Sequence, residues 1–155
     1  MTRKEESREL IYKEESYAII GACFAVCKDK GCGFLEPVYH ECLEIEFVFQ
    51  RIPFLSKPLQ TLQYRARTLV QTFSPDFICY DKIILEIKAV SVLIDEHRAQ
   101  VLNYLSAIGC KLGLLVILAI FQGSNTSGSF REASNLSIFG SNFRIFRVFR
   151  GQMNL

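Results

Sequence analysis

The sequence predicts an α/β fold, more narrowly an α+β arrangement in which helices flank one mixed β-sheet. Its 155 residues are enough for a single domain with one sizeable core. The hydrophobic periodicity gives the element order helix, helix, three strands, helix and strand. Residues 112–119 form a continuous apolar run, which is typical of a strand buried on both faces.

Two helices begin this order. Over residues 5–28, apolar positions recur at three- and four-residue spacing, at Leu10, Ile11, Tyr17, Ala18, Ala22 and Ala25. The glycines at 31 and 33 favour a turn before a second helix over 35–50, whose first turn accommodates Pro37. The apolar face of this second helix is predicted to consist of Val38, Cys42, Ile45 and Phe49, with Tyr39, Leu43 and Phe47 alongside.

Three extended segments follow at 58–64, 69–79 and 83–90, each rich in β-branched and aromatic residues. Tyr80-Asp81-Lys82 is typical of a tight turn, so the last two segments are predicted to form a hairpin. A helix is expected over 95–108, with Asp95 as its N-cap and Gly109 as its stop.

We expect one domain over residues 1–119 and a divergent C-terminal extension over 120–155. The start of the extension, 123–129, has the polar composition of a flexible segment. Residues 142–149 predict one final edge strand with a basic face, because Phe143, Ile145 and Phe149 alternate with Arg144, Arg147 and Arg150.

The composition is that of a soluble globular protein, since half of the residues are hydrophobic and 22% are charged. No apolar run reaches the roughly 18 residues that a membrane span needs. The N-terminus opens with alternating charges and lacks the apolar centre of a secretory signal, which predicts a cytoplasmic protein. The net charge of +2 permits a polyanionic partner without demanding one.

The chain has six cysteines but no C-x-x-C pair. In a reducing compartment disulfides are disfavoured, so buried free thiols are expected. Cys23, Cys27 and Cys32 are close enough in sequence for a metal cluster to remain an alternative.

The strongest chemical signal lies in the third extended segment. Glu86 and Lys88 are two residues apart, so both side chains point to one face of the strand, while Leu85 and Ile87 point to the other. Charged groups in such an apolar run are costly unless they are paired or bind a metal ion. Taken alone, an E-x-K pair is more often a salt bridge at a sheet edge than a catalytic group.

Asp76 strengthens the signal, because the predicted hairpin would bring it beside Glu86, ten residues later. Two adjacent carboxylates repel each other and raise one pKa unless a cation lies between them. Mg²⁺ suits two carboxylates together with water and a substrate phosphate. Lys88 could then orient or help deprotonate an attacking water, or stabilise charge on the phosphate.

Two further polar positions lie on the predicted helices. Glu36 begins the second helix, where the helix dipole favours negative charge, and it shares a face with Tyr39 and His40. Gln100 and Tyr104 share a face of the later helix. Taken alone, each of these positions is more often structural than catalytic.

Together these residues resemble a known family. Residues 33–39, Gly-Phe-Leu-Glu-Pro-Val-Tyr, read G-x-x-E-x-x-Y, and the chain resembles the GxxExxY protein family of the PD-(D/E)XK nuclease-like superfamily. The resemblance covers roughly residues 16–116 and continues at 43–46, 52–54, 75–77, 85–90, His97, Gln100, 103–105 and 111–115. It departs at 116–119, where relatives commonly carry Asn-Phe-Gly, and it is lost over 120–155.

The resemblance implies a restriction-endonuclease-like α-β-β-β-α-β core, here with an extra N-terminal helix. It implies that Asp76, Glu86 and the backbone carbonyl of Ile87 bind Mg²⁺ or Mn²⁺, with Glu36 assisting from the helix. Lys88 would serve the water or the phosphate, and Gln100 would be an accessory catalytic residue. Superfamily members usually cut DNA, and sometimes RNA, by metal-dependent phosphodiester hydrolysis.

Three functions remain open at this stage. The first is a Mg²⁺-dependent nuclease acting on DNA; the second is a catalytically silent nucleic-acid-binding module. The third is a protein-interaction domain in which the carboxylates and the lysine form a structural network. The small core suggests a homodimer or a partner, and basic residues that could track a phosphate backbone include Arg65, Arg67, Lys82, Arg98 and the C-terminal arginines.

Overall fold

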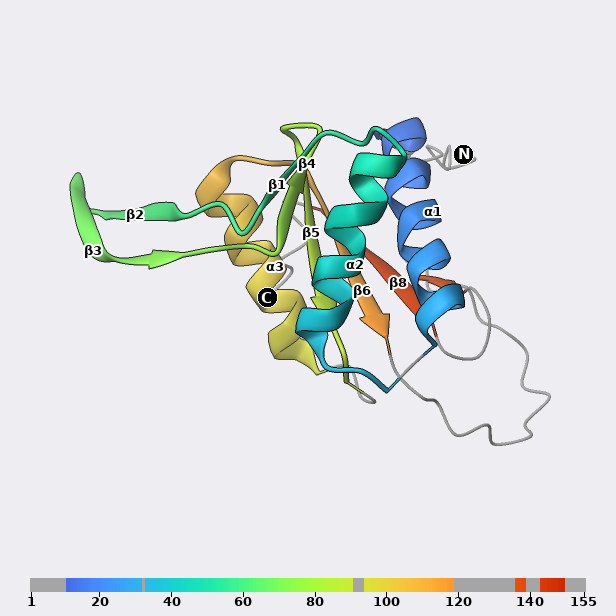
Figure 1. Ribbon diagram of the computed structural model, residues 1–155. Helices are drawn as coiled ribbons and strands as arrows, with labels where there is room; N and C mark the ends of the chain where they lie inside the picture. Colours follow the sequence, from blue (N-terminus) through green and yellow to red (C-terminus); the bar gives the residue numbers. More distant parts are fainter. Residues whose placement is uncertain (1–10, 32, 91–93, 119–135, 139–142, 150–155) are drawn as a thin grey trace, which may run out of the picture.

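The computed structural model describes residues 11–31, 33–90, 94–118, 136–138 and 143–149 (Figure 1). Two helices come first, α1 (Lys13–Lys30) and α2 (Glu36–Phe49). Five strands follow: β1 (Phe54–Ser56), β2 (Gln60–Tyr64), β3 (Arg67–Phe73), β4 (Phe77–Cys79) and β5 (Ile83–Lys88). Next come α3 (Asp95–Ile108), β6 (Leu112–Leu118), β7 (Leu136–Ile138) and β8 (Phe143–Phe149).

The main sheet has six strands in the order β1-β4-β5-β6-β8-β7. β5 and β6 are parallel and the other neighbouring pairs are antiparallel, so the mixed sheet expected from the sequence is confirmed. The elements α2, β1, β4, β5, α3 and β6 reproduce the α-β-β-β-α-β order, and α1 is the extra N-terminal helix. β2 and β3 form a separate two-stranded sheet that projects from the domain (Figure 1); we call it the arm.

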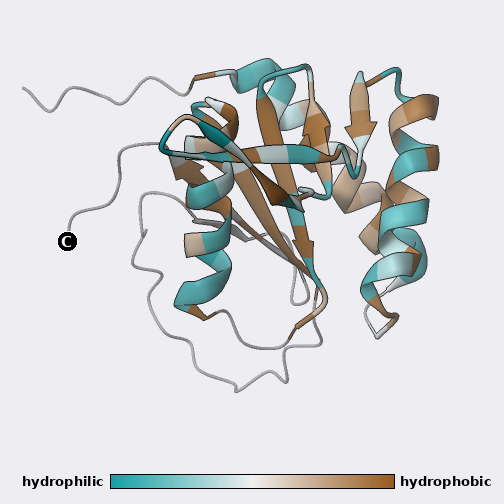
Figure 2. Cartoon of the chain, turned by 90° about the vertical axis from the view of Figure 1, so that its left-hand side faces the viewer, coloured by the Kyte–Doolittle hydropathy of each residue, from teal (hydrophilic) through white to brown (hydrophobic). Residues whose placement is uncertain are grey.

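Helices cover both faces of the main sheet. On one face, Ile83, Leu85 and Ile87 of β5 pack in a cluster with buried residues of α1 and α2. On the other face, Ile84 packs in a second cluster with Val101 and Leu105 of α3, as alternation along a strand requires. The central strands are accordingly hydrophobic in Figure 2, and the helices carry hydrophilic residues on their outer surfaces.

One predicted strand is in fact two. The segment 69–79 was expected to be continuous, but it is divided at Ser74-Pro75-Asp76 into β3 of the arm and β4 of the main sheet. Pro75 lacks the N–H that an interior strand must donate, which accounts for the break. The expected strand over 58–64 likewise contributes β2 to the arm, and the main sheet begins instead with the short β1.

The predicted apolar face of α2 was wrong. Ile45 is 64% exposed and Phe49 is 81% exposed, whereas Tyr39, Leu43 and Phe47 are fully buried. The buried residues are four apart and form one stripe toward α1 and the sheet. Apolar residues surround most of this helix, so periodicity alone could not choose between the two stripes.

Two smaller predictions also need correction. Asp95 is the first residue of α3, and the N-cap is Ile94, whose backbone N–H donates to His97 Nδ1 at 3.4 Å. β8 is not an edge strand, because it lies between β6 and β7 and pairs with both. The C-terminal stop of α3 is confirmed, since Gly109 adopts the left-handed conformation with φ +86°. Residues 5–10, 119 and 123–129 lie outside the described residues.

The cysteines are consistent with structural thiols. Cys23, Cys79 and Cys110 are buried, and burial raises the pKa of each thiol, that of Cys79 to about 12. Thiols that stay protonated are poor nucleophiles and poor metal ligands. Cys32, the third member of the alternative metal cluster, lies outside the described residues. No helix in the described ranges combines the length and the apolar character required to cross a membrane.

The packing of α3 on β6 can be tested at Gly113, where an added Cβ would come within 2.5 Å of Val101 Cγ1. We expect Gly113→Ala to lower the free energy of unfolding, measured by urea denaturation, by about 1–3 kcal/mol. Gly21→Ala in α1 is the control, because nothing lies within 4 Å of its Cβ position. Alanine should stabilise that exposed helical site by roughly 0.5–1 kcal/mol. Equal or increased stability of Gly113→Ala would contradict this packing.

Candidate active site

The β4–β5 hairpin brings Asp76 to Glu86. Tyr80 and Asp81 form its tight turn with φ +53° and +57°, and Lys82 N donates to Cys79 O at 3.1 Å, which confirms the predicted turn. Phe77 lies opposite Leu85 in the register. Asp76, one residue before β4 begins, is therefore beside Glu86.

Each of the two acidic side chains accepts a hydrogen bond from the backbone of the segment that carries the other. Asp76 N donates to Glu86 Oε1 at 2.8 Å, and Ile87 N donates to Asp76 Oδ2 at 2.8 Å. Because β4 begins only at Phe77, the Asp76 carboxylate provides the acceptor for a β5 amide beyond the paired residues of β4. This reciprocal pair fixes both carboxyl groups to the backbone and leaves Asp76 Oδ1 and Glu86 Oε2 outside these two bonds.

The electrostatics of Glu86 are unusual. Its side chain is 4% exposed, and burial together with the negative charge of Asp76 raises its pKa from 4.5 to about 8. The N–H of Asp76 and the ammonium group of Lys88, whose Nζ lies 3.8 Å from Glu86 Oε2, oppose this rise. A buried carboxyl with a like-charged neighbour is the environment in which a bound cation has most effect.

Helix α2 contributes to a small cavity next to Asp76. The cavity has a volume of about 100 Å³ and is lined by Glu36, Pro37, His40, Lys57, Asp76 and Ile87. Its size is sufficient for several water molecules. Glu36 and Asp76 therefore face a common space, although Glu86 approaches Asp76 from the β5 face that packs against α3.

His40 is held in one orientation within this cavity. Its ring is stacked on Phe77 with centroids 4.2 Å apart, and Nε2 lies 2.8 Å from Ser56 Oγ. Ser56 Oγ donates to Glu44 Oε1, so the serine oxygen must accept a hydrogen from His40 Nε2. In a neutral ring this leaves the lone pair on Nδ1, which lies 3.9 Å from Asp76 Oδ1.

Lys57 connects the cavity with the arm. Its backbone N–H donates to the carbonyl of Asp76 at 2.8 Å, and its φ of +44° is a costly conformation for a residue with a side chain. The bond fixes the chain just before the arm to the chain just after it. Strain of this kind is often retained close to functional sites.

Gln100 and Tyr104 lie on α3, on the other side of the carboxylate pair. Gln100 Nε2 donates to the Tyr104 hydroxyl at 2.9 Å, and the Tyr104 ring is stacked on Phe73 with centroids 4.8 Å apart. Burial, and to a smaller extent the negative charge of Glu86, raise the pKa of the Tyr104 hydroxyl. Gln100 thus reaches the site through Tyr104.

The G-x-x-E-x-x-Y segment has a structural explanation. Gly33 adopts φ +125°, which a residue with a Cβ rarely tolerates. The buried Tyr39 hydroxyl donates to Gly31 O at 2.7 Å and accepts from Phe34 N at 3.2 Å. Tyr39 therefore links the loop before α2 to the helix, and this loop determines the position of Glu36, the first residue of α2.

The ligand atoms at the site are of the kinds that a hard divalent ion prefers, but only some of them lie close to one another. Asp76, Glu86 and Glu36 supply carboxylate oxygens, and the 3.9 Å between His40 Nδ1 and Asp76 Oδ1 is less than twice a metal–ligand distance of about 2.1 Å. A cation would also relieve the repulsion that raises the pKa of Glu86. Within the described ranges, however, no three His, Cys, Asp or Glu side chains form a ready-made ligand group.

The sequence did not identify every residue at the site. His40 was noted only as sharing a helical face with Glu36, and that four-residue spacing is the signal that could have found it. Ser56 and Lys57 gave no usable signal, and Glu44 was included in the family resemblance at 43–46 without a role of its own. Their position depends on the contact between β1 and α2, which no local pattern encodes.

The raised pKa of Glu86 predicts how stability depends on pH. Between about 4.5 and about 8, the folded state holds a proton on Glu86 that the unfolded chain has lost. In metal-free buffer, stability should therefore fall as the pH rises through this window and level off above it. Glu86→Gln should reduce this slope, measured by urea denaturation from pH 5 to 9 in EDTA. Glu41→Gln, at an exposed position of α2, should keep it; an unchanged slope in Glu86→Gln would refute the assignment.

Comparison with known proteins is consistent with this geometry. A family profile described as the PD-(D/E)XK nuclease superfamily matches residues 13–125. A search of curated proteins found no match. A solved structure described as "Crystal structure of SSO0001" is similar in fold, with 16% sequence identity and a TM-score of 0.50. The similarity covers 90% of this chain and 57% of that one, so the chain spans little more than half of its length. By its match over most of the sequence, the chain belongs to the PD-(D/E)XK nuclease superfamily.

Proposed function

We propose that this protein is a divalent-metal-dependent nuclease that hydrolyses phosphodiester bonds, with DNA as its substrate. The observation that carries the proposal is the reciprocal bonding of Asp76 and Glu86, with Lys88 3.8 Å from Glu86 and a cavity beside Asp76. Membership of the superfamily supports the reaction class. Kinship with the GxxExxY family is part of the proposal and is supported by the roles of Gly33 and Tyr39 in the loop before α2.

Asp76 and Glu86 would hold Mg²⁺ or Mn²⁺ together with the backbone carbonyl of Ile87, and Glu36 would assist from α2. We add His40 to this set, because its Nε2–H is engaged by Ser56 and its Nδ1 faces Asp76. A hydrogen bond that fixes the far nitrogen of a histidine is a common support for a metal ligand. The bound ion would supply an activated water and neutralise charge on the phosphate.

The protein's own residues would do the remaining work. Lys88 carries its ammonium group beside the carboxylate pair, where it can orient the attacking water or stabilise the negative phosphate oxygens. Glu86, with its raised pKa, can hold a proton near neutral pH and release it when a cation binds. Gln100 would act by positioning Tyr104 against Glu86.

One observation favours a second candidate function. Because no three ligands are pre-assembled in the part of the chain that the structure describes, a nucleic-acid-binding module without hydrolysis is the alternative. It requires binding that is independent of divalent ions and no cleavage of any substrate. A purely structural role for the carboxylates requires that nucleic acid does not bind at all.

Digestion assays distinguish these functions. With Mg²⁺ or Mn²⁺, we expect cleavage of DNA, tested as single and double strands beside the corresponding RNAs. Asp76→Asn removes a metal ligand, and Lys88→Ala removes the group placed to act on the water or the phosphate, so each should reduce the rate at least about a hundredfold. Lys82→Ala is the control, because Lys82 lies at the other end of β5 in an ion pair with Glu15 at 2.7 Å. Cleavage without a divalent ion, or cleavage that survives both substitutions, would overturn the proposal.

Calorimetric titration tests the metal site without reference to activity. Asp76→Asn should abolish the binding of both ions. His40→Ala should weaken Mn²⁺ binding by about tenfold or more, and Mg²⁺ binding less, because Mg²⁺ prefers oxygen ligands and retains its waters. Glu41→Gln on the exposed face of α2 should bind both ions as the wild type does. Wild-type affinity in His40→Ala would exclude His40 from the site.

A further inference from the structure

We propose that the arm formed by β2 and β3 binds the phosphate backbone of a nucleic acid next to the active site, with Arg65 and Arg67 as its contacts. The inference rests on the proposed function for the identity of the ligand as nucleic acid. It goes beyond that function by naming the part of the molecule that binds the substrate.

The arm leaves the domain directly at the active site. Lys57 precedes it and lines the cavity, and Ser74 and Pro75 connect it to Asp76. Two hydrogen bonds fix its base, from Lys57 N to Asp76 O at 2.8 Å and from Ser74 Oγ to Pro58 O at 3.2 Å. A chain bound to the arm would therefore pass close to the carboxylate pair.

The arm and the residues that flank it carry a net positive charge. Residues 57–75 contain Lys57, Arg65 and Arg67 and no aspartate or glutamate, although acidic and basic residues are nearly balanced over the whole sequence. Arg65 and Arg67 are exposed at the tip, and the Arg65 guanidinium lies over the Tyr64 ring, 5.8 Å from its centroid. By contrast, Lys82, also a candidate from the sequence, is ion-paired with Glu15.

The turn at the tip retains an arginine where the backbone favours other residues. Arg65 and Ala66 have φ of +46° and +61°, a pair of left-handed residues for which Asn-Gly is the preferred sequence in a two-residue hairpin turn. Each non-glycine residue in this region costs about 1–2 kcal/mol. The turn thus places the Arg65 side chain at the tip of the arm, where it is exposed to solvent.

The arm is not part of the main sheet. Among the strands that the structure describes, β2 and β3 pair only with each other, and Val70 at 95% exposed and Tyr64 at 64% exposed add little to the core. A two-stranded sheet alone is marginally stable in water. Seven-residue β3 extends roughly 20 Å at about 3.3 Å per residue, which corresponds to about six base pairs of B-DNA.

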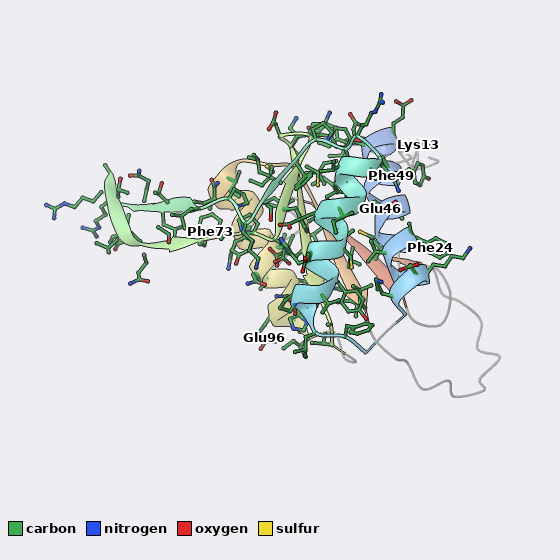
Figure 3. All side chains as sticks on the ribbon, viewed as in Figure 1. Lys13, Phe24, Glu46, Phe49, Phe73 and Glu96 are labelled. Carbon is green, nitrogen blue, oxygen red and sulfur yellow. The ribbon has the colours of Figure 1, made fainter. Side chains whose placement is uncertain are left out.

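The base of the arm packs against α3. Phe73 is opposite Gln60 and stacks on Tyr104 of α3, and Figure 3 labels it at the base of the arm. Tyr64 pairs with Arg67 at the far end of the arm, beyond a register shift between Thr61 and Gln63. The arm therefore carries one aromatic residue at its base, stacked on α3, and a second one beside Arg67 at its tip.

Binding is measured by fluorescence anisotropy with labelled DNA 30 nucleotides long, as a single strand and as a duplex. EDTA is present, so the measurement does not depend on hydrolysis. Arg65→Gln/Arg67→Gln should weaken binding at least about tenfold and reduce the slope of log K against log salt by about 1.8 for the duplex. Lys13→Ala/Lys28→Ala removes the same charge from exposed positions of α1, on the opposite side of the domain from the arm (Figure 3), and should bind as the wild type does.

A second variant separates function from folding. Arg65→Asn/Ala66→Gly installs the preferred turn, so it should leave the hairpin at least as stable while binding weakens severalfold. Wild-type affinity in both arm variants, or an equal loss in the α1 control, would overturn the proposal. A third outcome would also overturn it: the wild type sediments as a dimer, the arm variants sediment as monomers, and their DNA binding is unchanged. The arm would then be a contact between two copies of the chain. If DNA binding depends on the arm but no cleavage occurs in Mg²⁺ or Mn²⁺, the proposed nuclease activity is refuted and the proposed binding role of the arm still holds.

Discussion

The side chains of Asp76 and Glu86 meet at the N-terminal end of β4. Glu86 accepts a hydrogen bond from the backbone N–H of Asp76, and Asp76 accepts one from the backbone N–H of Ile87 in β5. The arrangement depends on β4 beginning only at Phe77, since a strand that began earlier could pair the Ile87 amide with a backbone carbonyl in place of the Asp76 carboxylate. The same bonds hold the buried carboxyl group of Glu86 next to the partly buried carboxylate of Asp76. Burial and the charge of Asp76 raise the pKa of Glu86, and a cation bound between the two carboxyl groups would lower it.

The rest of the domain supports this pair from both faces of the sheet. On one side, α2 presents Glu36 and His40, and the Tyr39 hydroxyl fixes the loop from which α2 begins. On the other side, α3 presents Tyr104 with Gln100 bonded to it. His40 has the more elaborate support, since Ser56 and Glu44 determine which of its nitrogens is free to face Asp76. Such support fixes the orientation of the ring before any ligand arrives.

The arm adds a different kind of element. The main sheet is stabilised by apolar contacts on both faces, whereas the arm is exposed on nearly all of its residues and joined to the domain through Lys57 and Asp76. Its base is anchored by the stack of Phe73 on Tyr104 of α3.

The sequence by itself determined the order of the core elements, the β4–β5 turn and the shared face of Glu86 and Lys88, because each depends on local spacing and turn chemistry. It also singled out Asp76 and Gln100, partly through the family resemblance. It did not reveal that Ser74-Pro75-Asp76 divides one apolar segment between two sheets, since β-propensity is similar on both sides of the break. Only the tertiary structure decided which stripe of α2 is buried and that His40, Ser56 and Lys57 adjoin the carboxylates. Those neighbours come from elements far apart in the chain, and their meeting depends on how α2 packs against the sheet, which no periodicity in a single segment specifies.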